Sequence, residues 1–496
     1  MDAVLEAVAI LATFENVGLL LAGTAVGIFI GAMPGLSVNM GLALLFPITF
    51  SVGGMSGIVM LLGIYCGAIY GGSITAILLR TPGTPASAAT TLDGYPMAMI
   101  NGQPGRALSI STMASTFGGI FSTVCLVLFA PMLAKVALQF SKPEYFALAV
   151  FGISMITSVS SGSILKGLVS CLIGLFIATI GLDAMSGLER FTLGTLYLSG
   201  GVSFMPILIG LFALTQVFVN VEDAYKNEQK KQNIKIDNVL PTWADFKLTL
   251  STLLRSSCIG TFIGCVPGTG GDISSWISYD QAKRWAKDKS QFGKGDPRGI
   301  AASESGNNSI VGGAFIPVLT LGIPGDGATA IILGALMVHG MQPGPLLFVD
   351  HAPDVYAIFI GMMAANIVMG IMGFSLIRLF VKVVNIPRII LLPIITIMAI
   401  IGTYSYNNSM NDVLIMFAAG IVGYFMYKIG MGVPGVIIGI ILGSLAEQNF
   451  TGSLMMSDGS LSIFATNPIC AVFLVLSVIS LLSPLYKGIL GKMLKN

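Results

Sequence analysis

Charged side chains are scarce in this sequence. Of 496 residues only 48 are charged, 25 Lys and Arg against 23 Asp and Glu, whereas 54% are apolar and 61 are glycine. A soluble domain usually carries about 25% charged residues, and the 10% found here is too little for a water-facing surface of this size. The composition therefore excludes a soluble enzyme. A net charge of +2 without a basic, aromatic-rich patch also gives no sign of a nucleic-acid partner.

The residues and motifs of several enzyme classes are scarce as well. The chain has two histidines, and its six cysteines show no CxxC spacing, so we expect no metal site and no catalytic residues. Neither GxxxxGK[ST] nor HExxH occurs, which leaves ATP-driven transport and zinc proteolysis unsupported. An intramembrane aspartyl protease is a remaining alternative, through Asp272 and Asp280. These acids are only eight residues apart, however, whereas catalytic acids should face each other from separate helices.

Long stretches of the chain have no charge at all. Residues 16–79, 191–221 and 459–486 contain no Lys, Arg, Asp or Glu. A helix that crosses a bilayer needs about 20 such residues, so there is room for roughly ten to twelve membrane elements. We therefore predict an all-α polytopic membrane protein that lies in a lipid bilayer and includes re-entrant hairpins.

Two basic segments predict the topology. Residues 222–255 and 280–304 hold 21 of the 48 charges, and Lys- and Arg-rich segments favour the cytoplasmic side. The first is the predicted cytoplasmic linker between two membrane repeats, residues 1–221 and 256–496. Between the two basic segments, only residues 256–271 are free of charge. This stretch is too short to cross the bilayer twice, so we expect a hairpin that enters and leaves on the inner face. Three acids and no base before Arg80 predict an external start and no cleaved signal.

Two pairs of motifs indicate that the halves are related. Gly27-Ile-Phe-Ile-Gly-Ala-Met-Pro-Gly35 matches Gly260-Thr-Phe-Ile-Gly-Cys-Val-Pro-Gly268 at six of nine positions, with an offset of 233. The segment 70–83 matches 311–325 if one residue is inserted, which sets Gly71-Gly72 against Gly312-Gly313. Two matches in the same order favour a duplication, and the topology favours inverted repeats.

Four apolar runs are interrupted by Pro-Gly, at 34–35, 82–83, 267–268 and 324–325. Proline lacks the N–H for a helical hydrogen bond and glycine permits positive φ, so each pair ends one helix and allows another to start. Ser37, Thr84, Thr269 and Asp326 follow at once and are residue types that cap helices. Helix N-termini attract carboxylates, and broken membrane helices are typical of secondary transporters built from repeats.

The polar residues at these breaks, and the run 303–309, are the predicted site. Asp272 and Asp326 are either cation sites or ordinary helix caps, Glu304 is either a cation site or a loop acid, and Arg80 either attracts an anion or lies at the interface. The predicted substrate-binding residues are Ser37, Asn39, Thr81, Thr84, Ser87, Gly268, Thr269, Gly270, Asn307, Asn308, Ser309 and Thr329, and the cation-coupling candidates are Asp272, Glu304 and Asp326.

Taken together, these motifs resemble the large permease subunit of the tripartite tricarboxylate transporter family. The resemblance rests on the break at 27–37, the run 70–87, Asp93-Gly-Tyr-Pro96, Val266-Pro-Gly-Thr-Gly-Gly-Asp272, the run 302–309, Leu321-Gly-Ile-Pro-Gly-Asp326 and Gly340-Met-Gln-Pro-Gly344. It covers most of 18–110 and 256–350.

The resemblance implies a bacterial inner-membrane permease for citrate-like tri- or dicarboxylates. Its partners would be a small membrane subunit and a periplasmic substrate-binding protein, and its energy source an ion gradient. No cofactor is implied beyond a coupling ion such as Na⁺ or H⁺. A stand-alone anion transporter or channel is the alternative.

Overall fold

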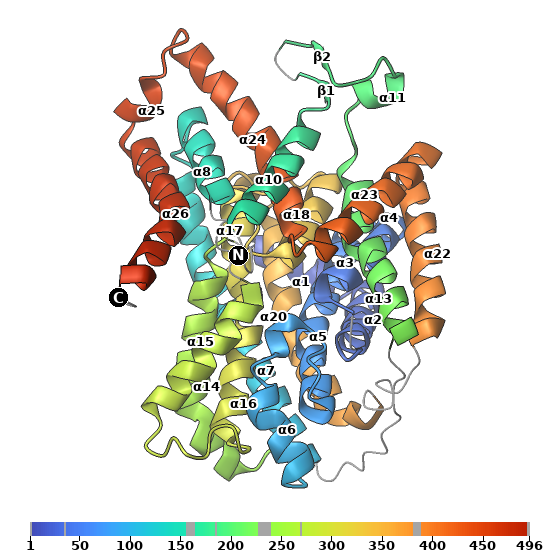
Figure 1. Cartoon of the computed structure of the whole chain (residues 1–496), viewed down its shortest axis with the longest axis vertical. Helices are drawn as coiled ribbons and strands as arrows, with labels where there is room; N and C mark the ends of the chain where they lie inside the picture. Colours follow the sequence, from blue (N-terminus) through green and yellow to red (C-terminus); the bar gives the residue numbers. More distant parts are fainter. Residues whose placement is uncertain are drawn as a thin grey trace.

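The computed structural model is almost entirely helical (Figure 1), as expected for an all-α membrane protein. It describes residues 2–33, 36–154, 164–183, 186–226, 240–267, 270–379 and 388–493. The one sheet in these residues is a short antiparallel hairpin, in which Gly181 pairs with Arg190 and Leu182 with Glu189.

The elements of the first half are α1 (Asp2–Leu11), α2 (Phe14–Gly31), α3 (Val38–Leu45), η1 (Phe46–Ile48), α4 (Thr49–Val52), α5 (Gly54–Leu79), η2 (Pro85–Ser87), α6 (Thr91–Tyr95), η3 (Pro96–Ile100), α7 (Pro104–Ala137), α8 (Lys142–Ser154), α10 (Ile164–Ala178), β1 (Gly181–Leu182), β2 (Glu189–Arg190), α11 (Leu196–Ser199), α12 (Phe204–Ile209), η4 (Gly210–Leu214) and α13 (Thr215–Lys226). Those of the second half are α14 (Trp243–Gly264), α15 (Gly270–Trp285), α16 (Pro297–Asn308), α17 (Ile310–Leu321), α18 (Gly327–Val338), α19 (Leu347–Asp350), α20 (Ala352–Ser375), α22 (Arg388–Asn407), α23 (Met410–Lys428), α24 (Pro434–Met456), α25 (Ile463–Thr466) and α26 (Pro468–Met493).

Many of these helices are suited to a bilayer. Among the described residues, six are long and apolar enough to cross it: α2, α5, α7, the continuous α12–η4–α13 unit, α20 and α23. Five shorter apolar segments accompany them. The polytopic membrane protein predicted from the charge-free runs is therefore confirmed.

Glycines let α2 and α5 pack backbone to backbone. A Cβ built on Gly27 would lie 2.4 Å from the Ile64 carbonyl oxygen, and one on Gly31 would lie 2.1 Å from that of Ala68. Because the contact residues advance together along both helices, α2 and α5 run parallel. Small residues allow this close approach in membrane proteins.

The second half repeats this packing with α14 against α16 and α17. A Cβ on Gly260, the match of Gly27, would meet the Gly306 carbonyl oxygen at 2.3 Å. A Cβ on Gly313 would meet the Thr261 carbonyl oxygen at 2.4 Å, and one on Gly71 would meet that of Ile28 at the same distance. Gly71 therefore corresponds to Gly313 at an offset of 242. The predicted alignment of Gly71 with Gly312 was wrong by one residue, and no insertion is needed.

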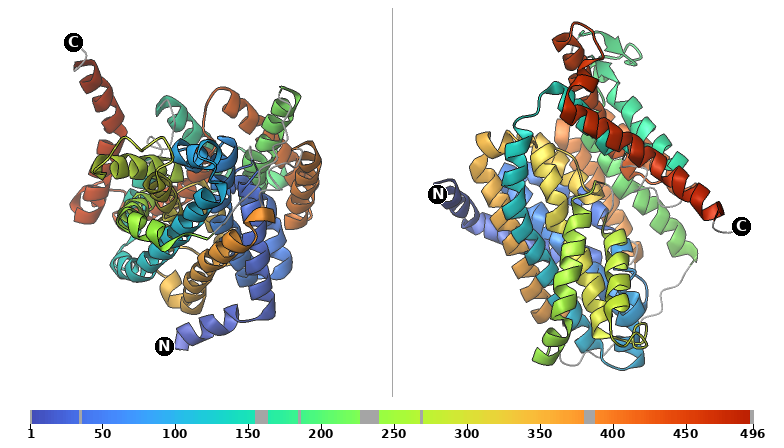
Figure 2. Two further views of the ribbon diagram at one scale, coloured as in Figure 1. Left: turned by 90° about the horizontal axis from the view of Figure 1, so that it is seen from below. Right: turned by 90° about the vertical axis from the view of Figure 1, so that its left-hand side faces the viewer.

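The matched helices run in opposite directions. The end of α5 leads to α6, and Asp93 in α6 binds the loop that joins α15 to α16. The same end of the molecule holds the start of α14 (Figure 1; Figure 2, right). Because α2 is parallel to α5, α2 and its match α14 are antiparallel. The hairpin β1–β2 lies at the opposite end (Figure 1).

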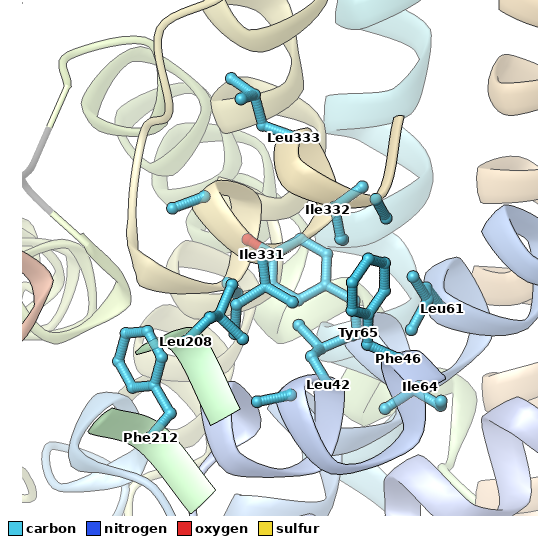
Figure 3. Packing of buried hydrophobic residues seen from close by; sticks show 14 of the residues in the cluster. Leu42, Phe46, Leu61, Ile64, Tyr65, Leu208, Phe212, Ile331, Ile332 and Leu333 are labelled. Carbon is cyan, nitrogen blue, oxygen red and sulfur yellow. The ribbon is translucent and has the colours of Figure 1, made fainter. Parts of the chain in front are cut away.

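Two groups of helices flank this central body. One consists of α12, η4 and α13 with α22 and α23, and the other of α8 and α10 with α24 and α26. Each group contains helices from both halves of the chain. Figure 3 shows how α3, α5, α12 and α18 bury apolar side chains together, with Leu42, Tyr65, Leu208 and Ile331 among them.

Two details differ from the sequence predictions, and one alternative that the sequence left open is decided. The hairpin predicted over residues 256–271 is longer than expected, because α14 begins at Trp243 and α15 continues to Trp285. The linker predicted over 222–255 is helical at both described ends, because α13 continues to Lys226 and α14 begins at Trp243. The run 303–309 is not a loop: residues 303–308 are buried in α16, and the helix breaks at Ser309.

Candidate functional site

A cavity of about 370 Å³ lies where the segments that follow the four Pro-Gly pairs meet, and Pro34, Gly35 and Gly268 themselves lie outside the described residues. Three residues after each break line it: 37–39 at the start of α3, 84–86 at η2, 270–272 at the start of α15, and 326–328 at the start of α18. The other lining residues come from α5, α15, α16, α17 and α24, and they are Tyr65, Ile69, Ile273, Asn307, Ile310, Pro434 and Ile438. Its size is within the ~300–1,000 Å³ of small-molecule sites.

Two of the predicted helix caps are present at the cavity. Ser37 Oγ accepts a hydrogen bond from the Met40 N–H at 3.1 Å and caps α3. Asp326 caps α18 in a reciprocal capping box with Thr329, in which Asp326 Oδ1 accepts from the Thr329 N–H at 2.8 Å. Asp326 is thus the N-cap of α18, as one of the two interpretations of this residue expected.

Tyr65 contacts Asp326 in the cavity wall. Its hydroxyl donates to Asp326 Oδ2 at 3.0 Å, so both carboxylate oxygens of Asp326 are bonded. Sequence reasoning missed Tyr65, because it stands inside a long apolar run and carries no motif of its own. Its position relative to Asn307 in the repeat is the one signal that could have found it.

Asn307 and Thr84, unlike Asp326, have buried polar atoms without hydrogen-bond partners among the described residues. Asn307 is fully buried in α16, and neither its Oδ1 nor its Nδ2 has a hydrogen-bond partner among the described residues. The Thr84 hydroxyl is likewise buried without a partner, so the prediction that its side chain caps the next helix was wrong. Unpartnered buried polar groups cost free energy, and in a cavity wall they are groups that a ligand can satisfy.

Asp272 is in the first turn of α15 and its side chain is exposed on the cavity wall. It makes no side-chain hydrogen bond or ion pair with another described residue. Gly270 starts this helix at φ +63°. A Cβ on Gly271 would lie 2.7 Å from Asn307 Oδ1, so Asn307 lies directly against the first turn of α15.

Several predicted site residues do not line the cavity. Thr81 is exposed, Ser87 donates to the Gly72 carbonyl oxygen, and Ser309 donates to that of Gly306. Asn308 points away from Asn307 and donates to Ser115 Oγ at 2.9 Å. Thr329 is buried in the capping box. Gly268 and Thr269 lie outside the described residues.

Glu304 and Arg80 also lie outside the cavity lining. Glu304 is fully buried in α16, where its carboxylate accepts from Thr90 Oγ1 and, at 3.0 Å, from Ser115 Oγ. It is therefore not a loop acid. Arg80 ends α5 in the left-handed region, exposed, with its guanidinium over the Tyr95 ring. It does not reach the cavity.

The arrangement gives little support to a metal centre or to a protease. The part of the chain that the structure describes contains no group of three His, Cys, Asp or Glu side chains that could hold a metal. Asp280 is half-exposed and pairs with Arg284 at 2.6 Å on the same helix, away from Asp272 and outside the cavity lining.

Comparison with known proteins gives one family. The model of the tripartite tricarboxylate transporter TctA family matches residues 17–444. A 52.8 kDa protein from the TAR-I ttuC' 3' region of Agrobacterium vitis is 36% identical over 473 residues, which covers 95% of this chain and 93% of that protein. A protein from the TAR-II ttuC' 3' region of the same organism is 36% identical over 233 residues, 47% of this chain and 96% of its own length. No solved structure matches.

Proposed function

Because the chain belongs to the TctA family of tripartite tricarboxylate transporters, we propose that it imports citrate-like tri- or dicarboxylates across the bacterial inner membrane as the permease subunit of a secondary transporter. The observation that carries this proposal is the convergence of the segments that follow all four Pro-Gly pairs on one cavity.

The cavity suits a carboxylate for a physical reason. Three helices, α3, α15 and α18, begin in its wall, and a helix N-terminus carries about half a positive charge and free N–H groups. Neutral Ser and Asn side chains add hydrogen-bonding groups, and the described lining of the cavity contains no Lys or Arg. The substrate would therefore be held by dipoles and released without breaking a buried ion pair.

The two antiparallel repeats support alternating access. Their equivalent breaks meet at one site, as in transporters with inverted repeats, and the flanking groups contain helices of both halves. In the proposed cycle the flanking groups and the central body move relative to each other, which exposes the cavity to one side at a time.

The partners follow from the family. A tripartite system has other subunits, and we propose that a periplasmic binding protein delivers the carboxylate and that a small membrane subunit completes the permease. An ion gradient of Na⁺ or H⁺ would drive accumulation, because no nucleotide-binding motif is present in the sequence.

Uptake by proteoliposomes tests the proposal. The three subunits together should accumulate labelled citrate above its external concentration only when an ion gradient is imposed. Asn307→Ala should abolish uptake while the protein stays inserted, because Asn307 lines the cavity and neither of its side-chain polar atoms has a partner among the described residues. Equilibration without accumulation would indicate a channel, and chemical conversion of the solute would indicate an enzyme.

A further inference from the structure

The duplicated register pairs the residues around the cavity. The offset of 233 pairs Asn39 with Asp272, and the offset of 242 pairs Thr84 with Asp326 and Tyr65 with Asn307. All six of these residues line the cavity. The cavity thus has two equivalent corners. We define the closed corner as Asn39, Tyr65 and Asp326, and the open corner as Asp272, Asn307 and Thr84.

The protein itself fills the closed corner. Tyr65 donates to Asp326 Oδ2 at 3.0 Å, and Thr329 donates to Asp326 Oδ1 through its N–H and its hydroxyl, at 2.8 and 2.7 Å. The carboxylate is therefore fully hydrogen-bonded within the chain, and the third member of the corner, Asn39, is neutral.

The open corner has the opposite properties. Asn307 stands in the place of Tyr65 but is too short to bridge, and Thr84 stands in the place of Asp326. Neither has a hydrogen-bond partner in the part of the chain described. The carboxylate of this corner, Asp272, occupies the position of Asn39 and pairs with no other described residue. The Gly271 contact places Asn307 against the same turn of α15 that carries Asp272.

We propose that the open corner is a binding site for a monovalent cation, Na⁺, with oxygen ligands from Asp272, Asn307 and Thr84. The inference rests on the proposed function only in taking this cation to be the coupling ion. It assigns Asn307 and Thr84 to the cation rather than to the substrate. The proposal gives one such site per chain, because Tyr65 and Thr329 already donate hydrogen bonds to the carboxylate of the closed corner.

The chemistry of the ligand set favours a cation. A carboxylate, an amide oxygen and a hydroxyl are the hard oxygen donors that such ions bind. A carboxylate at membrane depth is costly unless it is paired, and a bound cation pairs it. A second anion in this corner would face Asp272 directly, whereas a proton alone would leave Asn307 and Thr84 without partners.

Thermal melting of the purified chain in detergent tests the site without transport. NaCl should raise the melting temperature in a saturable way, compared with choline chloride at equal ionic strength. Ligand binding to the folded state produces such a shift. Asp272→Asn, Asn307→Leu and Thr84→Val should each raise the half-saturating Na⁺ concentration about tenfold or more. Asp272→Asn removes the negative charge that pairs with the ion, and the other two substitutions each remove one oxygen ligand.

Tyr65→Phe is the matched variant for the closed corner. It should lower the melting temperature without Na⁺ and keep the Na⁺-dependent shift, whereas Thr81→Val, at an exposed position outside the cavity, should change neither. The proposal is overturned if Na⁺ stabilises the parent chain no more than choline, or if Asp272→Asn and Asn307→Leu keep the parent's half-saturation. Uptake of citrate driven by a proton gradient would then still leave the proposed function standing.

Discussion

Two aspartates reach the cavity, and their neighbours decide what each can do. Both carboxylate oxygens of Asp326 accept hydrogen bonds, from Tyr65 and Thr329. The Asp272 carboxylate also lines the cavity, but it makes no hydrogen bond or ion pair with another described residue. Sequence alone could not separate them, since both follow a Pro-Gly break. The difference arises from Tyr65, which approaches Asp326 across 261 residues of chain.

Asp272→Asn should uncouple transport from the ion gradient. The amide keeps the shape of the side chain but removes the negative charge that would hold the cation, so substrate should still enter the cavity. We expect accumulation under a Na⁺ gradient to fall at least tenfold, while exchange of internal for external citrate persists. Counterflow and net uptake in the same proteoliposomes distinguish these outcomes. Full gradient-driven accumulation by Asp272→Asn would remove it from the coupling site.

Asp93 acts on stability rather than on transport chemistry. It is fully buried, and its Oδ1 accepts from the N–H groups of Gly293, Gly295 and Asp296, each at 2.8 Å, while Tyr279 donates to Oδ2. Burial raises the pKa of Asp93, and these hydrogen bonds oppose the rise. The carboxylate thereby fastens the loop between α15 and α16 to α6.

Asp93→Ala should therefore destabilise the protein by about 2–4 kcal/mol, because it leaves several buried donors unpaired. Asp93→Asn keeps one acceptor oxygen and should lose less than half as much. Protease cleavage within 286–296 and the melting temperature would report the difference. Equal behaviour of the two variants would mean that the carboxylate does not hold this loop.

At the scale of elements, the sequence predicted the breaks better than the helices around them. Pro-Gly pairs act locally, so the starts of α3 and α18 follow from residues such as Ser37 and Asp326. The length of α14 does not follow in this way, because charged residues such as the exposed Lys247 and the half-buried Arg255 lie on a helix whose other face is packed. The repeat register was also misjudged, since Gly312 and Gly313 are adjacent and only the backbone contact with Thr261 distinguishes them.

Glycines of α2 provide a matched test of the close helix packing. Gly31→Ala would place a Cβ 2.1 Å from the Ala68 carbonyl oxygen, whereas Gly18 has nothing within 4 Å of its Cβ position. The backbone of α5 cannot move aside locally, so Gly31→Ala should cost about 3 kcal/mol or more and prevent stable insertion. Gly18→Ala should be neutral or stabilise by up to ~1 kcal/mol.

The yield of monodisperse protein after extraction, followed by its melting temperature, would compare the two variants. If Gly31→Ala were as stable as Gly18→Ala, α2 and α5 would not be in direct backbone contact.

At the scale of the whole molecule, the membrane class and its duplication could be predicted, but the meeting of the four breaks could not. Charge-free runs and motif repeats are local in sequence. The cavity instead joins positions that are far apart in the chain, such as Ser37 and Asp326, which are about 290 residues apart. The packing of α2 on α5, and of α14 on α16 and α17, brings them together.

The orientation in the membrane gives a prediction for the whole chain. The loop 286–296, rich in Lys, should face the cytoplasm, and the hairpin β1–β2 at the other end should face the periplasm. Ser290→Cys should react with a membrane-impermeant maleimide only after the cells are opened, whereas Ser186→Cys should react in intact spheroplasts. Both positions are exposed, and labelling of the unsubstituted chain provides the background. Labelling of Ser290→Cys in intact spheroplasts would reverse the proposed topology.

The central claim is that the cavity between the four breaks binds and moves a carboxylate. The most direct measurement is uptake of labelled citrate, succinate and malate by proteoliposomes that contain this chain, the small membrane subunit and the binding protein, under separately imposed Na⁺ and H⁺ gradients. The account predicts gradient-driven accumulation of at least one carboxylate, and its loss in Asn307→Ala. The absence of any carboxylate uptake by the complete system would contradict it, whereas accumulation that survives in Asn307→Ala would remove Asn307 from the transport site.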